Sequence, residues 1–274
     1  MRLFIRHRTT YVFDTVQERL VQLARLTPPS VGGQTVLSWD IDVTSDAVLR
    51  KSRDGYGNKL TMLYIDGPVE SLTVEVSGEV LTENGAGIVG KFPEPLPPEV
   101  FLRDTDLTQA DPAIRALAGE ARITGATMLD QLHGLMRILG ERVRFDTGNM
   151  DVTRSAAQAL QQGHGVCQDL THLFVAAART MNVPARYVSG HLFRQDGETE
   201  QAAAHAWAEA WLDDIGWVGF DPANGISPDD RYIRVAVGLD YREAAPLSGA
   251  RVGGGREMLD VAVSVVQSGA QTQS

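Results

Sequence analysis

The chain is poor in cysteine, since Cys167 is the single one among its 274 residues. One cysteine excludes an internal disulfide, so a hydrophobic core has to hold the fold together. With 43% hydrophobic residues, a chain of this length can bury the core of one large domain or of two modest ones. The lone thiol is consistent with a reducing compartment.

Long apolar runs are missing from the start of the chain. Charge returns directly after the apolar residues 3–5, and this stretch is far too short for a signal-peptide core or a membrane span. The sequence therefore predicts a cytoplasmic protein that does not insert into a membrane.

An excess of basic charge is also absent, because the formal net charge is −10. Proteins that bind nucleic acid by electrostatic attraction ordinarily carry a basic patch that contacts the phosphates. The charge balance therefore argues against nucleic acid as a partner.

The first part of the chain has the alternation that is typical of β-strands. Such segments, separated by turn signals rich in glycine, proline and aspartate, lie at 3–13, 36–43, 59–65 and 71–81. The sequence predicts an antiparallel β-sandwich over residues 1–85. Residues 86–98 are rich in glycine and proline and are predicted to form a linker.

After this linker the hydrophobic period becomes helical. Asp111 and Pro112 are typical of a helix start, and apolar residues then repeat at three and four positions between Met128 and Leu139. Further along, strand-like segments lie at 185–193, 204–212 and 216–221, with a last pair near 231–239 and 257–266. Helices followed by antiparallel strands indicate an α+β core. We predict this core over residues 99–267 and a disordered tail over residues 268–274.

Cys167 lies where a glycine-rich turn enters an apolar helix, which is predicted to end near Asn182 and Pro184. A helix N-terminus carries partial positive charge and unpaired N–H groups, and both stabilise a thiolate. Gly163 and Gly165 leave room for a substrate carbonyl, and the backbone N–H of Cys167 is a candidate oxyanion donor. Cys167 is therefore a candidate nucleophile.

A histidine for this nucleophile is found on a later alternating strand. His205 shares one strand face with Trp207, while the alternate positions 204, 206, 208 and 210 are all alanine and allow a helix to pack closely. A turn centred on Asp214 pairs Trp207 with Asp221 on the next strand. Asp221 then lies diagonally beside His205, at roughly 7–8 Å between Cα atoms. A register slip of one residue would turn Asp221 to the other face and separate the pair.

These motifs together resemble the transglutaminase-like superfamily in its bacterial form with an N-terminal β-domain. The resemblance rests on GVCQD, PARYVSG, HAW, GWVGFDP and the late segment VAVGLDY, in this order. It implies a papain-like, transglutaminase-type core with a Cys-His-Asp triad, which corresponds here to Cys167, His205 and Asp221. The family includes peptidases, amidases and protein cross-linkers, so the resemblance implies acyl transfer and does not choose the acceptor.

Other residues near the candidate site have simpler interpretations. His164 and His172 flank Cys167, but their spacing fits no common zinc pattern. We therefore expect no metal, and the proposed chemistry requires no organic cofactor. Asp169 is expected to cap the helix, and Arg186 is expected either to line the substrate groove or to form an ion pair.

The sequence favours a cysteine-dependent enzyme that hydrolyses peptide or isopeptide bonds, with a peptide or protein as its substrate. Protein-glutamine transglutamination is the alternative within the same class. Two hypotheses from other classes are a non-catalytic peptide-binding module with the same fold and a thiol redox sensor. No sequence feature indicates an oligomeric state.

Overall fold

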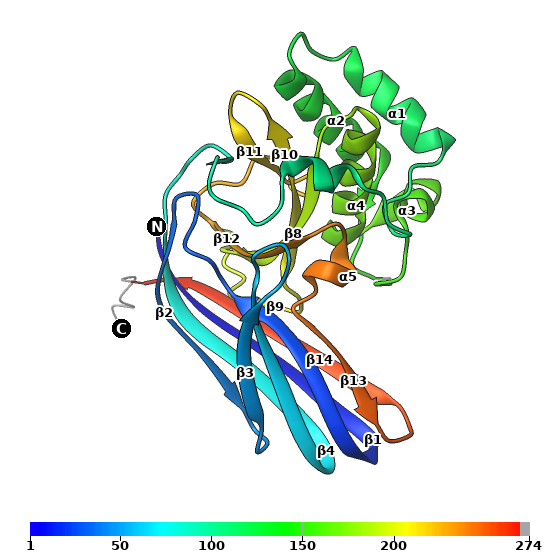
Figure 1. The fold of residues 1–274 in the computed structure, drawn as a ribbon. Helices are drawn as coiled ribbons and strands as arrows, with labels where there is room; N and C mark the ends of the chain where they lie inside the picture. Colours follow the sequence, from blue (N-terminus) through cyan, green and yellow to red (C-terminus); the bar gives the residue numbers. More distant parts are fainter. Residues whose placement is uncertain (149–150, 269–274) are drawn as a thin grey trace.

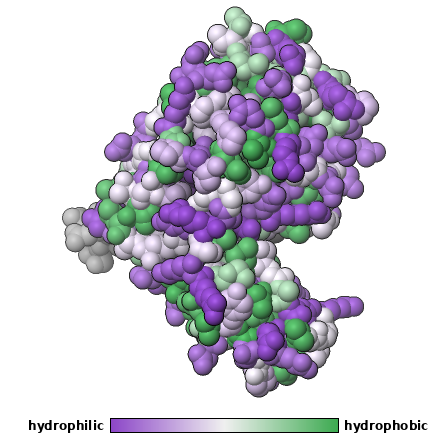
Figure 2. Space-filling view, in the orientation of Figure 1, coloured by the Kyte–Doolittle hydropathy of each residue, from purple (hydrophilic) through white to green (hydrophobic). Residues whose placement is uncertain are grey.

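The computed structural model describes residues 1–148 and 151–268. These residues form two packed parts, each built around its own sheet. Figure 1 shows long strands forming one part, with a smaller sheet and its covering helices forming the other. On the face shown in Figure 2, hydrophilic side chains cover much of both parts. The α+β fold predicted from the sequence is confirmed.

The long strands belong to one antiparallel sheet with the order β2-β4-β1-β14-β9, to which β3 and β13 also pair. Their bounds are β1 Arg2–Thr27, β2 Gln34–Val43, β3 Val48–Arg53, β4 Lys59–Thr82, β9 Glu200–Gln201, β13 Leu247–Val252 and β14 Glu257–Gln267. We call this sheet the β-domain.

The β-domain is a sandwich because its two longest strands fold over. The register between β1 and β4 is broken between Val12 and Gln17, and beyond this irregularity β1 runs back along the other half (Figure 1). The first half of β1 pairs with β14 and the second half pairs with β13. Buried side chains from both halves, including Tyr11, Leu20 and Val74, form a common core between them.

The pairing of β13 and β14 corrects the predicted domain boundaries. The sequence placed residues up to 267 in the core, whereas 247–252 and 257–267 complete the β-domain. Alternation shows that a segment is a strand, but it does not identify the sheet whose edge that strand will cover. Ser268 bonds to Arg2 and Glu79, and the rest of the predicted tail lies outside the described residues.

The predicted linker is also fixed to the second part. Its strand β5 (Ile88–Gly90) pairs with β11 (Gly216–Phe220), and the Glu94 carboxylate forms an ion pair with the buried Arg186. Glycine and proline here shape an edge of the second sheet and do not act as a free tether.

The second sheet has the order β12-β8-β10-β11-β5. Its remaining strands are β8 Ala185–Leu192, β10 His205–Leu212 and β12 Tyr232–Gly238. The register between β10 and β11 pairs Leu212 with Gly216 and Ala208 with Phe220, as the sequence predicted. Two short strands, β6 (Arg144–Phe145) and β7 (His164–Gly165), form a separate parallel pair.

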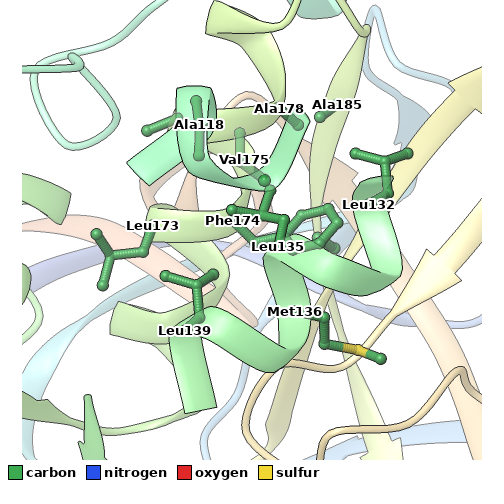
Figure 3. Packing of buried hydrophobic residues seen from close by; sticks show 14 of the residues in the cluster. Ala118, Leu132, Leu135, Met136, Leu139, Leu173, Phe174, Val175, Ala178 and Ala185 are labelled. Carbon is green, nitrogen blue, oxygen red and sulfur yellow. The ribbon is translucent and has the colours of Figure 1, made fainter. Parts of the chain in front are cut away.

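Helix α4 packs against the alanine face of β10, and α1, α2 and α3 pack around α4. The helices of the second part are η1 Pro98–Leu102, α1 Pro112–Arg122, α2 Met128–Arg142, α3 Ala156–Gln162, α4 Cys167–Thr180 and α5 Tyr241–Ala244. Asp111 caps α1 with Pro112 in its first turn, as predicted. Ala208 and Ala210 are fully buried in the same core as Phe174 of α4 and Leu135 of α2, whose packing Figure 3 shows. None of the helices within the described residues has both the length and the apolar character needed to cross a membrane.

We predict that a chain consisting of residues 98–274 does not fold on its own. It retains β13 and β14 but lacks β1, with which both pair, so Val263 and Val265 lose the buried environment they have in the whole protein. Size-exclusion chromatography should show aggregates, and circular dichroism should show no cooperative thermal transition. A monodisperse fragment with a sharp transition would contradict the observed domain organisation.

Candidate active site

The turn that precedes Cys167 is held rigidly. Gly163 ends α3 with a φ of 68°, a left-handed conformation that favours glycine. A Cβ atom on Gly165 would lie 2.6 Å from a carboxylate oxygen of Asp169, so this position has no space for a larger residue. The conformation of Gly163 and the close packing at Gly165 therefore fix the path of the chain into α4.

Asp169 fixes the first turn of α4. Its Oδ2 accepts a hydrogen bond from the Val166 N–H at 2.9 Å, which confirms the predicted capping role. The same oxygen lies 3.1 Å from Nη1 of the buried Arg154. Burial raises the pKa of Asp169, although the Val166 amide and Arg154 act in the opposite direction.

Cys167 is the first residue of α4 and is half-buried. Its side chain packs against a cluster formed by Tyr187 of β8, Ala206 of β10 and Ala244 of α5. A thiol at this position is partly open to solvent and lies at the N-terminal end of the helix, where backbone N–H groups have no partner within the helix.

His205 and Asp221 form a close pair. His205 begins β10, Asp221 directly follows β11, and His205 Nε2 lies 2.6 Å from Asp221 Oδ2. The pair depends on the β10–β11 register, because the register places both residues at the same end of neighbouring strands. With Nε2 bonded to Asp221, the other ring nitrogen, Nδ1, is available to a partner on the opposite side.

The electrostatics of this pair favour the imidazolium. The pKa of His205 is raised to about 10: burial acts to lower it, but the hydrogen bond and charge of Asp221, followed by the interaction with Cys167, outweigh burial. The pKa of Asp221 is lowered, since its bonds to His205, Asn224 and Tyr232 outweigh the effect of its own burial. Cys167, His205 and Asp221 thus form one electrostatic unit, whereas their catalytic roles remain predictions.

Asp221 also has partners that the sequence analysis missed. Its Oδ1 accepts the backbone N–H groups of Ala223 and Asn224, and its Oδ2 accepts the Asn224 amide and the Tyr232 hydroxyl, both at 2.7 Å. Asn224 could have been inferred, because aspartate commonly bonds to the residues that follow it in a turn. Tyr232 could not, because its place beside Asp221 depends on the order of strands in the sheet.

Other residues that stand out in the sequence are structural. The His172 ring is buried, its Nε2 accepts the Tyr241 N–H at 3.1 Å, and burial is the main cause that lowers its pKa to about 3. Arg186 is fully buried and donates to Glu209 at 2.7 Å, so of its two interpretations the ion pair is correct. Over residues 1–148 and 151–268, His, Cys, Asp and Glu form no group of three that could hold a metal ion.

Comparisons with known proteins match both parts of the chain. The model of the Transglutaminase-like superfamily matches residues 115–222, which include Cys167, His205 and Asp221. The model of the Bacterial transglutaminase-like N-terminal region matches residues 3–81. An uncharacterized protein of Mycobacterium leprae is 30% identical over 284 residues, which cover 97% of this chain and 99% of the relative.

Two further similarities concern proteins with named activities. A crystal structure from Cytophaga hutchinsonii, named as a candidate cysteine protease, has a TM-score of 0.77 at 20% identity and covers 97% of this chain and 90% of its own. It therefore shares the fold. A protein-glutamine γ-glutamyltransferase of Pseudomonas aeruginosa is 31% identical over 107 residues, which are 33% of this chain and 15% of that enzyme.

We predict a pH-dependent contribution of His205 to stability. Because its pKa in the folded protein is about 10, against 6.5 when unperturbed, the stabilisation is complete below pH 6.5 and is lost as the pH rises towards 10. The difference in unfolding free energy between the wild type and His205→Gln should shrink by a few kcal/mol over this range. Urea unfolding at pH 6.5, 8 and 10 measures it, and a constant difference would contradict the ion pair.

Proposed function

Because the chain belongs to the transglutaminase-like superfamily, we propose that it is a cysteine-dependent acyl-transfer enzyme with Cys167, His205 and Asp221 as its catalytic triad. The observation that carries the proposal is the 2.6 Å contact between His205 and Asp221, combined with the influence of Cys167 on the pKa of the same histidine. A nucleophile, a base and a group that orients the base are the parts that such chemistry needs.

In the proposed reaction, the Cys167 thiolate attacks the carbonyl carbon of an amide, and the sulfur–carbon bond forms. The carbonyl π electrons move to oxygen, where the backbone N–H of Cys167 is the proposed donor to the oxyanion. When the intermediate collapses, the carbon–nitrogen bond breaks and the His205 imidazolium protonates the leaving amine. A thioester remains on Cys167.

The second half of the reaction releases the acyl group. His205, now neutral, removes a proton from water as the water oxygen attacks the thioester carbon. The carbon–sulfur bond then breaks, which yields a carboxylic acid and restores the thiolate–imidazolium pair. Asp221 holds the imidazole by Nε2 in both steps, and its negative charge stabilises the cation whenever His205 carries the proton.

We favour hydrolysis of peptide or isopeptide bonds, with water as the acceptor. The fold shared with the Cytophaga hutchinsonii protein supports this choice, because that protein is named as a candidate cysteine protease. Transglutamination, in which an amine replaces water, is the alternative and is supported by the Pseudomonas aeruginosa relative. A binding module would be favoured by a fully buried thiol, whereas Cys167 is half-buried.

We predict that His205 activates Cys167. An ordinary cysteine is only a few per cent thiolate at neutral pH, so His205→Ala should lower the rate of alkylation by iodoacetamide roughly tenfold at pH 7. Mass spectrometry of the intact protein measures the rate. Circular dichroism of the same variant controls for unfolding, and equal rates in two folded proteins would contradict the thiolate–imidazolium pair.

We also predict which product is formed. The protein is incubated with a mixed peptide pool and a labelled primary amine, with Cys167→Ala as the matched control. New peptide termini that depend on Cys167 are expected and indicate hydrolysis of peptide bonds. Label incorporated at glutamine in excess of cleavage would show transglutamination, and no Cys167-dependent product would favour the binding module.

A further inference from the structure

Tyr232 connects Asp221 to the strand that borders the β-domain. Tyr232 is the first residue of β12, its side chain is buried, and its hydroxyl donates to Asp221 Oδ2 at 2.7 Å. The same oxygen lies 2.6 Å from His205 Nε2. The Tyr232 ring also packs at 5.4 Å on Trp207 and at 5.9 Å on His205, measured between ring centroids. Tyr232 therefore contacts both members of the pair.

Amide side chains of the β-domain hold β12 in place. The Gln34 amide donates to the Arg234 carbonyl at 2.9 Å and accepts the Arg234 N–H at 2.8 Å. Asn58 makes the same pair of bonds with the backbone of Val237, at 2.7 and 2.9 Å. Both amides are buried. They satisfy backbone groups of β12 in the way that a neighbouring strand would.

The β-domain holds the chain on both sides of Tyr232. Two residues after Tyr232, the Arg234 N–H donates to the Gln34 side chain. Two residues before Tyr232, the Asp230 carbonyl accepts a hydrogen bond from the Thr82 hydroxyl. A small pocket at this boundary, of about 60 Å³, is lined by Gln34, Thr82 and Tyr232 among other residues of both parts. Tyr232 is thus placed by contacts that come from outside the second sheet.

We propose that Tyr232 is a positioning residue for the His205–Asp221 pair and that Gln34 of the β-domain keeps it in place. The inference rests on the proposed function and deepens it. It gives the β-domain a role in building the active site, although none of the proposed catalytic residues lies in the β-domain.

The chemical role of the Tyr232 hydroxyl follows from its acceptor. A donor to a carboxylate stabilises the ionised form and restricts its rotation. The titratable groups that face this carboxylate are His205 and Tyr232, with Cys167 beyond the imidazole and Arg231 next to Tyr232. Without the hydroxyl, Asp221 should take up a proton at higher pH, and the imidazolium then loses the charge that stabilises it.

The test uses the pH dependence of Cys167 alkylation by iodoacetamide in the full chain. Tyr232→Phe removes only the hydroxyl and should move the acid limb of the profile upward by about one pH unit, so that the rate on this limb falls about tenfold. The plateau rate should be unchanged. Tyr56→Phe is the matched control, because the Tyr56 hydroxyl donates to Glu243 at 2.6 Å and not to Asp221; this variant should keep the wild-type profile.

The role of Gln34 is tested by a double-mutant comparison. Gln34→Ala should move the acid limb in the same direction as Tyr232→Phe but less far, whereas Asn58→Ala, which loses the similar clamp at Val237, should move it less than Gln34→Ala. If Gln34 acts through the Tyr232 hydroxyl, the double variant should show no shift beyond that of Tyr232→Phe. Fully additive shifts would overturn the role of Gln34.

The outcomes separate this inference from the proposed function. If His205→Ala lowers the alkylation rate but Tyr232→Phe retains the wild-type profile, Tyr232 has no positioning role and the triad stands. If His205→Ala leaves the rate unchanged, the proposed function itself fails. A shift in Tyr56→Phe as large as that in Tyr232→Phe would also overturn the inference, because the effect would then not depend on Asp221.

Discussion

The burial of the Asp221 carboxylate is the constraint on which the rest of the site depends. An ionised carboxylate that is removed from water costs a large amount of free energy unless charges and donors surround it. Here the His205 ring, the Asn224 amide, the Tyr232 hydroxyl and two backbone N–H groups supply them. These partners come from a strand, a turn and a further strand, so the carboxylate is stable only when all three are assembled.

This requirement links chemistry to architecture. The imidazole is held by one nitrogen because Asp221 is held, and Asp221 is held partly by β12, which the β-domain braces at Gln34 and Asn58. The β-domain is in turn completed by β13 and β14, which follow the second sheet in the chain. The chain thus leaves the β-domain, forms the second part and returns. The β-domain is therefore built from both ends of the chain, and the second part that lies between them is braced by it.

Much of the second sheet was predictable because its signals are local. A tight turn at Asp214 sets the register of β10 on β11, and the alternation of alanine with larger residues identifies the face that packs on α4. The same signals predicted that His205 and Asp221 would meet, and the glycine turn predicted the helix start at Cys167. Tyr232, in contrast, lies on β12, which pairs with β8 and is separated from β10 by it. Tyr232 and Asp221 therefore come from strands that are not neighbours in the sheet. No local spacing encodes that contact.

The sequence by itself therefore determined many of the helices and strands, the register of one hairpin and the three candidate residues, because each depends on neighbours within a few positions or on an ordered set of motifs. It did not indicate the strands at 48–53 and 247–252 or the second half of β1. Only the tertiary structure decided which sheet receives the C-terminal strands and that residues 88–90 of the predicted linker form an edge strand. It also decided that Tyr232 and Gln34 belong to the surroundings of the site. The physical reason is that such contacts join residues far apart in the chain. Strand edges and amide side chains accept many partners with similar energy, and the packing of the whole molecule selects among them.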